Sequence, residues 1–121
     1  MAMSPRAAAA ALAQRWGLQD VAPADLRSLA ERGLIRIVLP GVWPLYEVEG
    51  FTAVEELRRM GEERRAWWAV SVNRWDAAYL LGLSVDEFEA VVARHGLRAG
   101  RFDRYRRTDV LGLRDKLSQL R

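Results

Sequence analysis

The sequence predicts a mainly α-helical protein with small β-hairpins, arranged as two similar halves over residues 1–70 and 71–121. Three observations support this prediction. Apolar residues recur at helical spacing through much of the chain. Glycines follow several of these stretches, where the C-terminal cap of a helix favours glycine. One β-branched run, Leu34 to Leu39, has the composition of a strand, and Leu45 to Val48 predicts its return after the turn at Pro40-Gly41.

In the first half, the alanine-rich stretch from Ala7 to Trp16 predicts a helix that ends at Gly17. Pro23 stands where a first-turn proline is favoured, so a second helix is expected to begin there and to close at Gly33. Met1 to Arg6 is expected to be a frayed tail, as the ends of many chains are.

A longer helix is expected after the hairpin. It either runs unbroken to Val70 or kinks at Gly61, and Ser71 to Arg74 is expected to be a linker. Trp16 and Trp75 lie at or near the first helix of each half, where large aromatic side chains are expected to be core residues.

The second half follows a helix-turn-helix plan. Trp75 to Leu81 predicts a short apolar helix, Gly82 to Ser84 a tight turn, and Val85 to His95 an amphipathic helix. The arginine-rich segment Leu97 to Arg107 is expected to fold as a hairpin, and Thr108 to open a third helix. A hairpin and a closing helix make the winged version of this motif, so the second half indicates nucleic-acid binding.

The two halves also share a sequence pattern. ALAQRWGL parallels DAAYLLGL, and LAERGLI parallels VARHGLR, with Gly-Leu at the same point of each pair. Gly17 and Gly82 are 65 residues apart, and Gly33 and Gly96 are 63 apart. Such a repeat predicts two tandem winged helix-turn-helix units, a covalent pseudo-dimer.

Basic charge is concentrated in the second half. Residues 1–70 carry nine arginines and nine acids, whereas residues 71–121 carry the whole net charge of +3. Between Arg94 and Arg107 there are six arginines and one acid, Asp103. Such a field attracts phosphate without sequence preference. The alternative interpretation is a solvated basic face.

Five features of the second half occur in a characteristic order. They are Ala77-Ala78, Leu81-Gly82-Leu83-Ser84, Gly96-Leu97, Arg104-Tyr105-Arg106-Arg107, and Asp109-Val110 with Leu113. Together they resemble the MerR-like and excisionase-like winged helix-turn-helix families, most clearly over residues 75–113. The resemblance implies binding to double-stranded DNA through the major groove, with the wing on the backbone or minor groove. It implies a small transcriptional regulator or a recombination and excision accessory factor.

The second helix of this motif departs from a DNA-reading surface, because Asp86, Glu87 and Glu89 stand at its start, where phosphates would repel them. Ser84 with Glu87 is better explained as a capping box. DNA contact is therefore assigned mainly to the second wing, with some base readout from the first half. The predicted DNA-binding residues are Arg27, Ser28, Arg32, Arg94, Arg98, Arg101, Arg104, Arg106 and Arg107.

The first wing is apolar, and two explanations stand. It packs on the helix that carries Trp67 and Trp68, or it forms an interface with a second copy or another protein. The second explanation gives the alternative function, a protein–protein interaction module of a DNA-processing assembly that also uses the acidic second helix. The predicted interface residues are Ile35, Ile37, Leu39 and Trp43.

Other chemistry is not predicted. The chain has no cysteine and a single histidine, His95, which is expected to be a helix-end residue rather than a catalyst. Phosphate-loop, dinucleotide and zinc-protease motifs are absent, and the paired acids of residues 55–63 are expected to form ion pairs on a helix surface. We therefore expect no enzyme activity, metal, cofactor or small-molecule substrate, no membrane association, and a cytoplasmic location.

Overall fold

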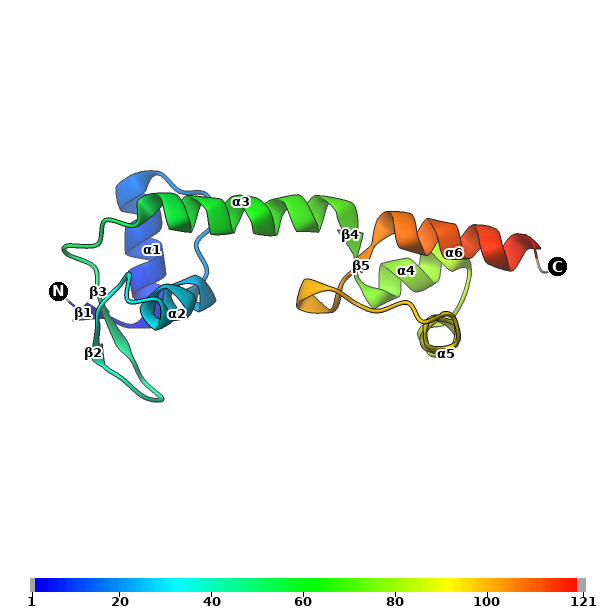
Figure 1. The fold of residues 1–121 in the computed structure, drawn as a ribbon, viewed down its shortest axis with the longest axis horizontal. Helices are drawn as coiled ribbons and strands as arrows, with labels where there is room; N and C mark the ends of the chain where they lie inside the picture. The colour runs from blue at the N-terminus through cyan, green and yellow to red at the C-terminus, as the bar shows by residue number, and fades with distance from the viewer. Residues whose placement is uncertain (1, 120–121) are drawn as a thin grey trace. The chain divides into compact units, whose positions relative to one another are not determined.

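The computed structural model describes residues 2–119, and the chain divides into two compact units, Met1–Arg65 and Ala66–Arg121. The described residues form six α-helices and two small antiparallel sheets, so the mainly helical fold class with small β elements is confirmed (Figure 1). The division falls inside helix α3 (Val54–Val70), a few residues before the position expected from the sequence repeat.

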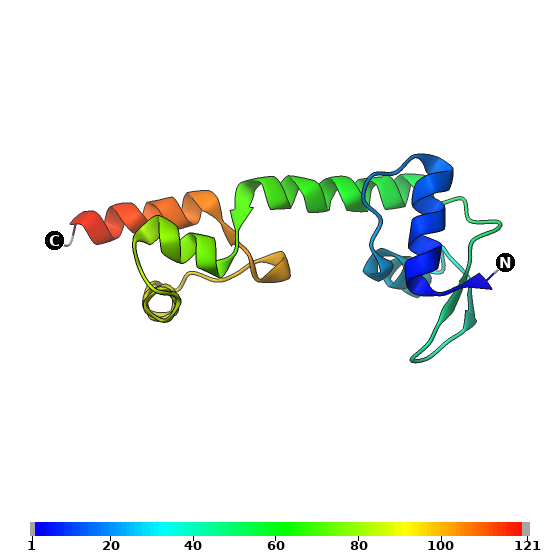
Figure 2. The same ribbon diagram turned by 180° about the vertical axis from the view of Figure 1, so that it is seen from behind.

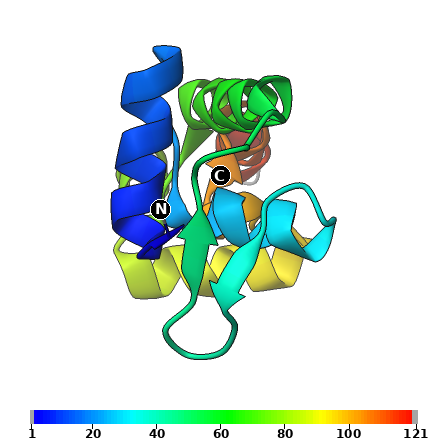
Figure 3. The same ribbon diagram turned by 90° about the vertical axis from the view of Figure 1, so that its left-hand side faces the viewer.

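The first unit combines a three-stranded sheet with two short helices and the first part of α3. In order, its other elements are β1 (Ala2–Met3), α1 (Pro5–Trp16), α2 (Pro23–Glu31), β2 (Ile37–Leu39) and β3 (Leu45–Glu47). The strand order is β1-β3-β2, with both pairs antiparallel. The β2–β3 hairpin is confirmed, although β2 is shorter than predicted, and its loop projects from the rest of the unit (Figure 3).

The frayed tail predicted for the N-terminus is wrong over the residues that the structure describes. Ala2 pairs with Glu47 and Met3 with Tyr46. The Ser4 hydroxyl accepts a hydrogen bond from the Ala7 N–H at 3.4 Å, and α1 begins at the next residue. A two-residue strand is too short for a periodic signal, so its partner far along the chain determines it.

The core of the first unit lies between α1, α2, the sheet and the start of α3. Its fully buried apolar side chains come from four elements: Leu12, Leu26, Leu29, Tyr46 and Leu57. Trp16, predicted to be a core residue, is 38% exposed at the end of α1. Helix α1 instead buries Leu12 together with two small residues, Ala8 and Ala9.

A buried ion-pair network fixes α3 against the start of α2. Arg64 donates from Nη1 and Nη2 to the Asp25 carboxylate at 2.8 and 2.9 Å, and from Nε to Asp20 at 2.8 Å. These bonds, first to Asp25 and then to Asp20, raise the pKa of Arg64 above its ordinary value. Asp25 also accepts from the Ala22 N–H at 3.0 Å, which caps α2.

Gly61 permits this close approach. A Cβ at Gly61 would stand 2.5 Å from the backbone carbonyl oxygen of Asp20, closer than non-bonded atoms can come. Helix α3 passes through Gly61 unbroken to Val70. The glycine therefore serves packing, and the kink considered from the sequence does not occur.

The second unit has the same kinds of element in fewer residues. After the end of α3 they are β4 (Ser71–Val72), α4 (Arg74–Leu81), α5 (Val85–His95), the 3-10 turn η1 (Arg101–Asp103), β5 (Tyr105–Arg106) and α6 (Arg107–Gln119). Strand β4 pairs antiparallel with β5, and α4 packs beside α6 (Figure 2). The predicted linker is wrong, because Ser71 and Val72 form a buried strand and Asn73 caps α4 by accepting from the Asp76 N–H at 2.8 Å.

The two helices predicted on either side of a glycine turn are present as α4 and α5, with residues Gly82 to Ser84 between them. Gly82 ends α4 in the left-handed conformation, with φ of 70°. The predicted capping box opens α5: the Glu87 N–H donates to Ser84 Oγ at 3.1 Å, and the Ser84 N–H donates to the Glu87 carboxylate at 3.0 Å. Phe88 and Val92 are buried, whereas His95 is exposed at the helix end.

Apart from β2, which has no counterpart in the second unit, both units follow the order strand, helix, glycine, helix, glycine, strand and helix. Each first strand pairs with a later strand, and each pairing places a tyrosine opposite an apolar residue: Met3 opposite Tyr46, and Val72 opposite Tyr105. The matched glycines all have positive φ: Gly17, Gly33, Gly82 and Gly96. Among residues 2–119, no helix is both long and apolar enough to cross a membrane.

Candidate nucleic-acid interface

The arginine-rich segment was predicted to be a hairpin over Leu97 to Arg107, and this is wrong. Strand β5 pairs with β4, from the start of the unit, rather than with residues just before it. The preceding segment closes only a tight turn, in which the Gly100 N–H donates to the Arg104 carbonyl at 2.8 Å. Strand β4 is buried, so pairing with it places β5 against the core of the unit. Residues 97–99, which would have formed the other strand of the predicted hairpin, have no regular structure.

Arg104 was predicted to contact DNA, and its burial contradicts this. Its side chain donates to Ser71 Oγ and to the Ser71 carbonyl, both at 2.7 Å, and its guanidinium lies 3.8 Å from the centre of the Trp68 ring. The residue is 8% exposed. It satisfies carbonyl groups at the end of α3 and is a structural residue of the second unit.

Trp67 also contacts the turn of residues 100–104. Its indole N–H donates to the Arg101 carbonyl at 2.9 Å. Gly100 lies against the same indole, since an added Cβ would stand 2.9 Å from the ring. The guanidinium of Arg106 lies 5.4 Å from the ring centre. The arginine-rich turn is therefore fixed to the last turn of α3 by hydrogen bonds and ring contacts.

The other five predicted arginines of this unit differ from Arg104 because all are exposed. Among residues 2–119, no carboxylate lies within ion-pair distance of them. We call them the open arginines: Arg94, Arg98, Arg101, Arg106 and Arg107. Their charges remain available to a phosphate-bearing partner.

The acids at the start of α5 have internal roles. Ser84, first through its backbone N–H and then through its hydroxyl, holds the pKa of Glu87 below the ordinary value. Glu89 accepts from Arg74 at 3.1 Å. Asp86 is exposed in the first helical turn, where the helix dipole favours a negative charge. This helix start is thus built for helix stability.

The DNA-binding residues predicted in the first unit do not form a comparable surface. Arg27 is exposed and Ser28 is half-buried on α2. Arg32 donates to Glu56 at 2.8 Å, and Glu56 also accepts from Arg59 at 2.7 Å. These bonds, first from Arg59 and then from Arg32, hold the pKa of Glu56 below its ordinary value. Arg32 is therefore partly neutralised.

The residues predicted for a partner interface separate into two groups. Ile35 is buried in the core of the first unit and Ile37 packs partly against it, so Ile35 is wrong as an interface residue. Leu39 and Trp43 are 55% and 85% exposed, and Val42, another apolar residue of the same wing, is 84% exposed. Trp43 stands at the tip of a hairpin, where too few neighbouring residues exist to cover a large ring.

Helix α4 exposes two aromatic residues, Trp75 and Tyr79. The first was predicted to be buried, and no prediction was made for the second. Trp75 was expected in the core, yet it is 62% exposed, and the Arg74 guanidinium lies 5.2 Å from its ring centre. Tyr79, one turn later, is also exposed. Helix α4 buries Ala77 and Ala78 instead, so its apolar composition gave no signal of which face is buried.

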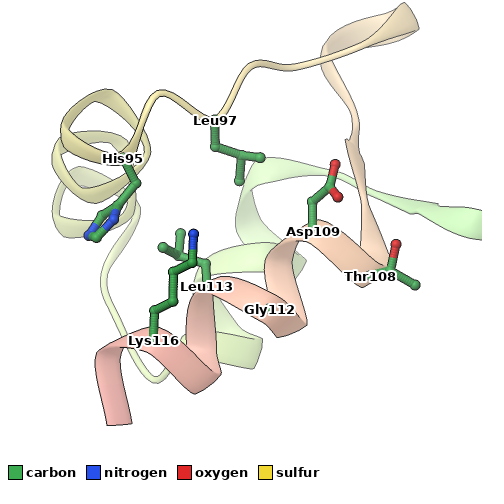
Figure 4. A pocket seen from close by; sticks show the side chains of 7 residues that line it. All are labelled: His95, Leu97, Thr108, Asp109, Gly112, Leu113 and Lys116. Atoms are coloured by element: carbon green, nitrogen blue, oxygen red, sulfur yellow. The ribbon is translucent and has the colours of Figure 1, made fainter. Parts of the chain in front are cut away.

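A surface pocket of about 250 Å³ lies between the end of α5 and α6 (Figure 4). His95 and Lys116 stand at one end, and Thr108 and Asp109 at the other. The opposed charges mean that this pocket does not extend the cationic surface. Within the described part of the chain, no three His, Cys, Asp or Glu side chains gather as a metal site would require.

Comparison with known proteins gives no relative: the chain matches no protein-family model, no curated protein and no solved structure. The function therefore has to be argued from the open arginines and the elements that present them.

Proposed function

We propose that this chain binds double-stranded DNA, and that its two units are tandem winged helix-turn-helix units of unequal role. The second unit supplies most of the binding through the open arginines. The order strand, helix, glycine turn, helix, strand and helix in both units supports the tandem arrangement. A small transcriptional regulator or a recombination accessory factor is the role that suits such a chain.

The observation that carries the proposal is the lack of carboxylate partners around the open arginines. The first unit has as many acids as arginines, and four of its arginines form ion pairs: Arg32, Arg58, Arg59 and Arg64. In the second unit, five arginine side chains have no carboxylate partner among residues 2–119, and they extend from the end of α5 to the start of α6. Trp67 and Arg104 fix the turn that lies in the middle of this segment. Guanidinium groups on a fixed support suit phosphate oxygens, which they contact bidentately.

The test is fluorescence anisotropy with a labelled duplex at several salt concentrations. Each phosphate neutralised contributes about −0.9 to the slope of log K against log salt, so five arginines predict a slope of about −4.5. Replacing Arg94, Arg98 and Arg106 together by alanine should reduce the slope by about 2.7. The absence of binding at low salt would overturn the proposal.

A matched control uses three exposed arginines of α3 that already have partners. Arg58 pairs with Glu55, Arg59 with Glu56 and Glu63, and Arg65 donates to Gln19. Replacing Arg58, Arg59 and Arg65 by alanine changes the net charge by the same amount. The slope should then stay close to that of the natural protein, which separates local contacts from a general charge effect.

A second candidate function is protein interaction through the loop of the first hairpin, and the exposure of Val42 and Trp43 favours it. Such a loop would bury its apolar side chains against a second copy or another protein. Sedimentation velocity over a range of concentrations tests the first case. Self-association that Trp43→Asp abolishes would support it, and a monomer at all concentrations would exclude the second copy.

A further inference from the structure

The arginine-rich turn contains two consecutive residues in a backbone conformation that side chains disfavour. Phe102 has φ of 59° and Asp103 has φ of 54°. Glycine and asparagine adopt this region readily, and a bulky aromatic residue seldom does. Strained positions of this kind persist only where the surrounding structure imposes them, and they cluster at functional sites.

The surrounding contacts of this turn are sufficient to impose the conformation. The Gly100 N–H donates to the Arg104 carbonyl, and the Arg104 N–H donates to the Arg101 carbonyl at 3.2 Å. Arg104 is itself anchored in the buried network with Ser71, and Trp67 donates to the Arg101 carbonyl. Hydrogen bonds therefore fix both ends of the turn, at Arg101 and Arg104, and the two residues between them adopt the disfavoured conformation.

The tip presents an aromatic ring beside one arginine, Arg101. Phe102 is 52% exposed, and one edge of its ring meets Trp68, with ring centres 6.0 Å apart. The Arg101 guanidinium lies 5.2 Å from the centre of the Phe102 ring. Folding alone would favour glycine or asparagine at this position. A phenylalanine at this position is explained if its exposed face has a ligand.

We propose that Phe102 is an apolar wedge that packs against an unstacked base step of duplex DNA, while the neighbouring open arginines hold the flanking phosphates. This inference rests on the proposed DNA binding. It adds an apolar contact with the bases, which arginines bound to phosphates do not make. Apolar side chains that enter a base step partly unstack it and bend the duplex. A rigid tip suits this role because the wedge must not give way when the bases are separated.

The experiment compares two labelled duplexes of the same sequence, one fully paired and one with a single mismatched step. A mismatch removes much of the stacking energy that a wedge has to overcome. The natural protein should therefore bind the mismatched duplex about tenfold more tightly or better. A 2-aminopurine base at the step should become brighter on binding, because its fluorescence rises when it unstacks.

Phe102→Asn is the decisive variant. Asparagine accepts the positive φ, so the turn should fold at least as well, yet the wedge is gone. This variant should lose the preference for the mismatch and the 2-aminopurine signal, while the salt slope stays unchanged because no charge is altered. Phe102→Leu keeps an apolar side chain and should retain part of the preference.

Trp43→Ala is the matched control, since it also removes an exposed aromatic ring from a turn tip, but in the neutral unit. It should leave the preference unchanged. If the natural protein binds both duplexes equally, or if Phe102→Asn keeps the preference, the wedge is overturned while DNA binding stands. If neither duplex is bound at low salt, the proposed function itself fails.

Discussion

The two units contain equal numbers of arginines, nine in residues 1–65 and nine in residues 66–121, but they use them differently. In the first unit Arg64 is locked between two aspartates, and Arg59 pairs with two glutamates. In the second unit Arg74 pairs with Glu89 and Arg104 is buried against carbonyls, while no acid within residues 2–119 pairs with an open arginine. The number of arginines is therefore not what distinguishes the two units. The difference lies in whether each guanidinium already has a carboxylate partner.

The two units also differ in the surroundings of their exposed apolar side chains. The most exposed apolar residues of the first unit, Val42 and Trp43, lie at a hairpin loop. In the second unit Phe102 is exposed on a turn fixed to α3, and the Arg101 guanidinium lies beside its ring. The same succession of elements thus supports a neutral unit with an apolar tip and a basic unit with an arginine-flanked ring. The predictions below test this division, beginning with the largest effect.

Breaking the ion-pair network of the first unit should have the largest effect. Arg64→Ala leaves the Asp25 carboxylate buried without its cation, and loss of one partner of a buried pair costs about 3–5 kcal/mol of folding stability. Urea unfolding followed by circular dichroism measures the loss. Arg59→Ala, on the exposed face of the same helix, should cost far less, because solvent screens an exposed ion pair. Equal small losses in both would contradict the network.

In the second unit, Arg104→Ala and Arg106→Ala should separate structure from binding. Arg104→Ala removes charge-assisted hydrogen bonds to Ser71 and should lower stability by about 2–3 kcal/mol without changing the salt slope. Arg106→Ala should leave stability unchanged and reduce the slope by about 0.9. A lower slope for folded Arg104→Ala protein would return this residue to the DNA contacts.

The glycines of two helices should respond with opposite signs. Gly61→Ala places a Cβ against the Asp20 carbonyl and should destabilise by about 1–3 kcal/mol, although alanine is the better helix former. Gly112→Ala in α6 meets no atom within 4 Å and should stabilise by up to about 1 kcal/mol. Thermal unfolding of both variants checks the signs, and stabilisation by Gly61→Ala would refute the close approach.

The smallest effect concerns the capping box of α5. Because the folded pKa of Glu87 lies below 4.5, its carboxylate contributes stability above that pH and loses it as the pH falls through the lowered value. Glu87→Gln should therefore melt slightly lower than the natural protein at neutral pH. The two melting temperatures should converge in acid.

Local signals explain which features could be predicted from the sequence. Gly17 and Gly82 mark helix ends through their own conformation, and Ser84 with Glu87 caps α5 across three residues. Such contacts involve neighbours in the chain, so residue type and spacing are sufficient. The same reasoning identified the β2–β3 hairpin from its turn.

Contacts between distant residues explain the failures. Strand β4 and the burial of Arg104 depend on a pairing between residues 71–72 and 105–106, and the segment between them gives no indication of it. The sequence alone does not distinguish an arginine that hydrogen-bonds to the carbonyl groups at a helix end from an exposed arginine that could bind phosphate. The strained conformation of Phe102 was equally hidden, because only the anchored ends of its turn impose it.

The attachment of the arginine-rich turn to α3 also limits how this chain could have been rearranged in evolution. The sequence repeat begins near Ser71, but the indoles that meet Arg101 and Arg104 precede it, at Trp67 and Trp68. A gene cut at the start of the repeat would encode a second unit that lacks those indoles. The turn would then lose its contacts at Arg101 and Arg104, so the second unit needs the last turn of the preceding helix as part of its own structure.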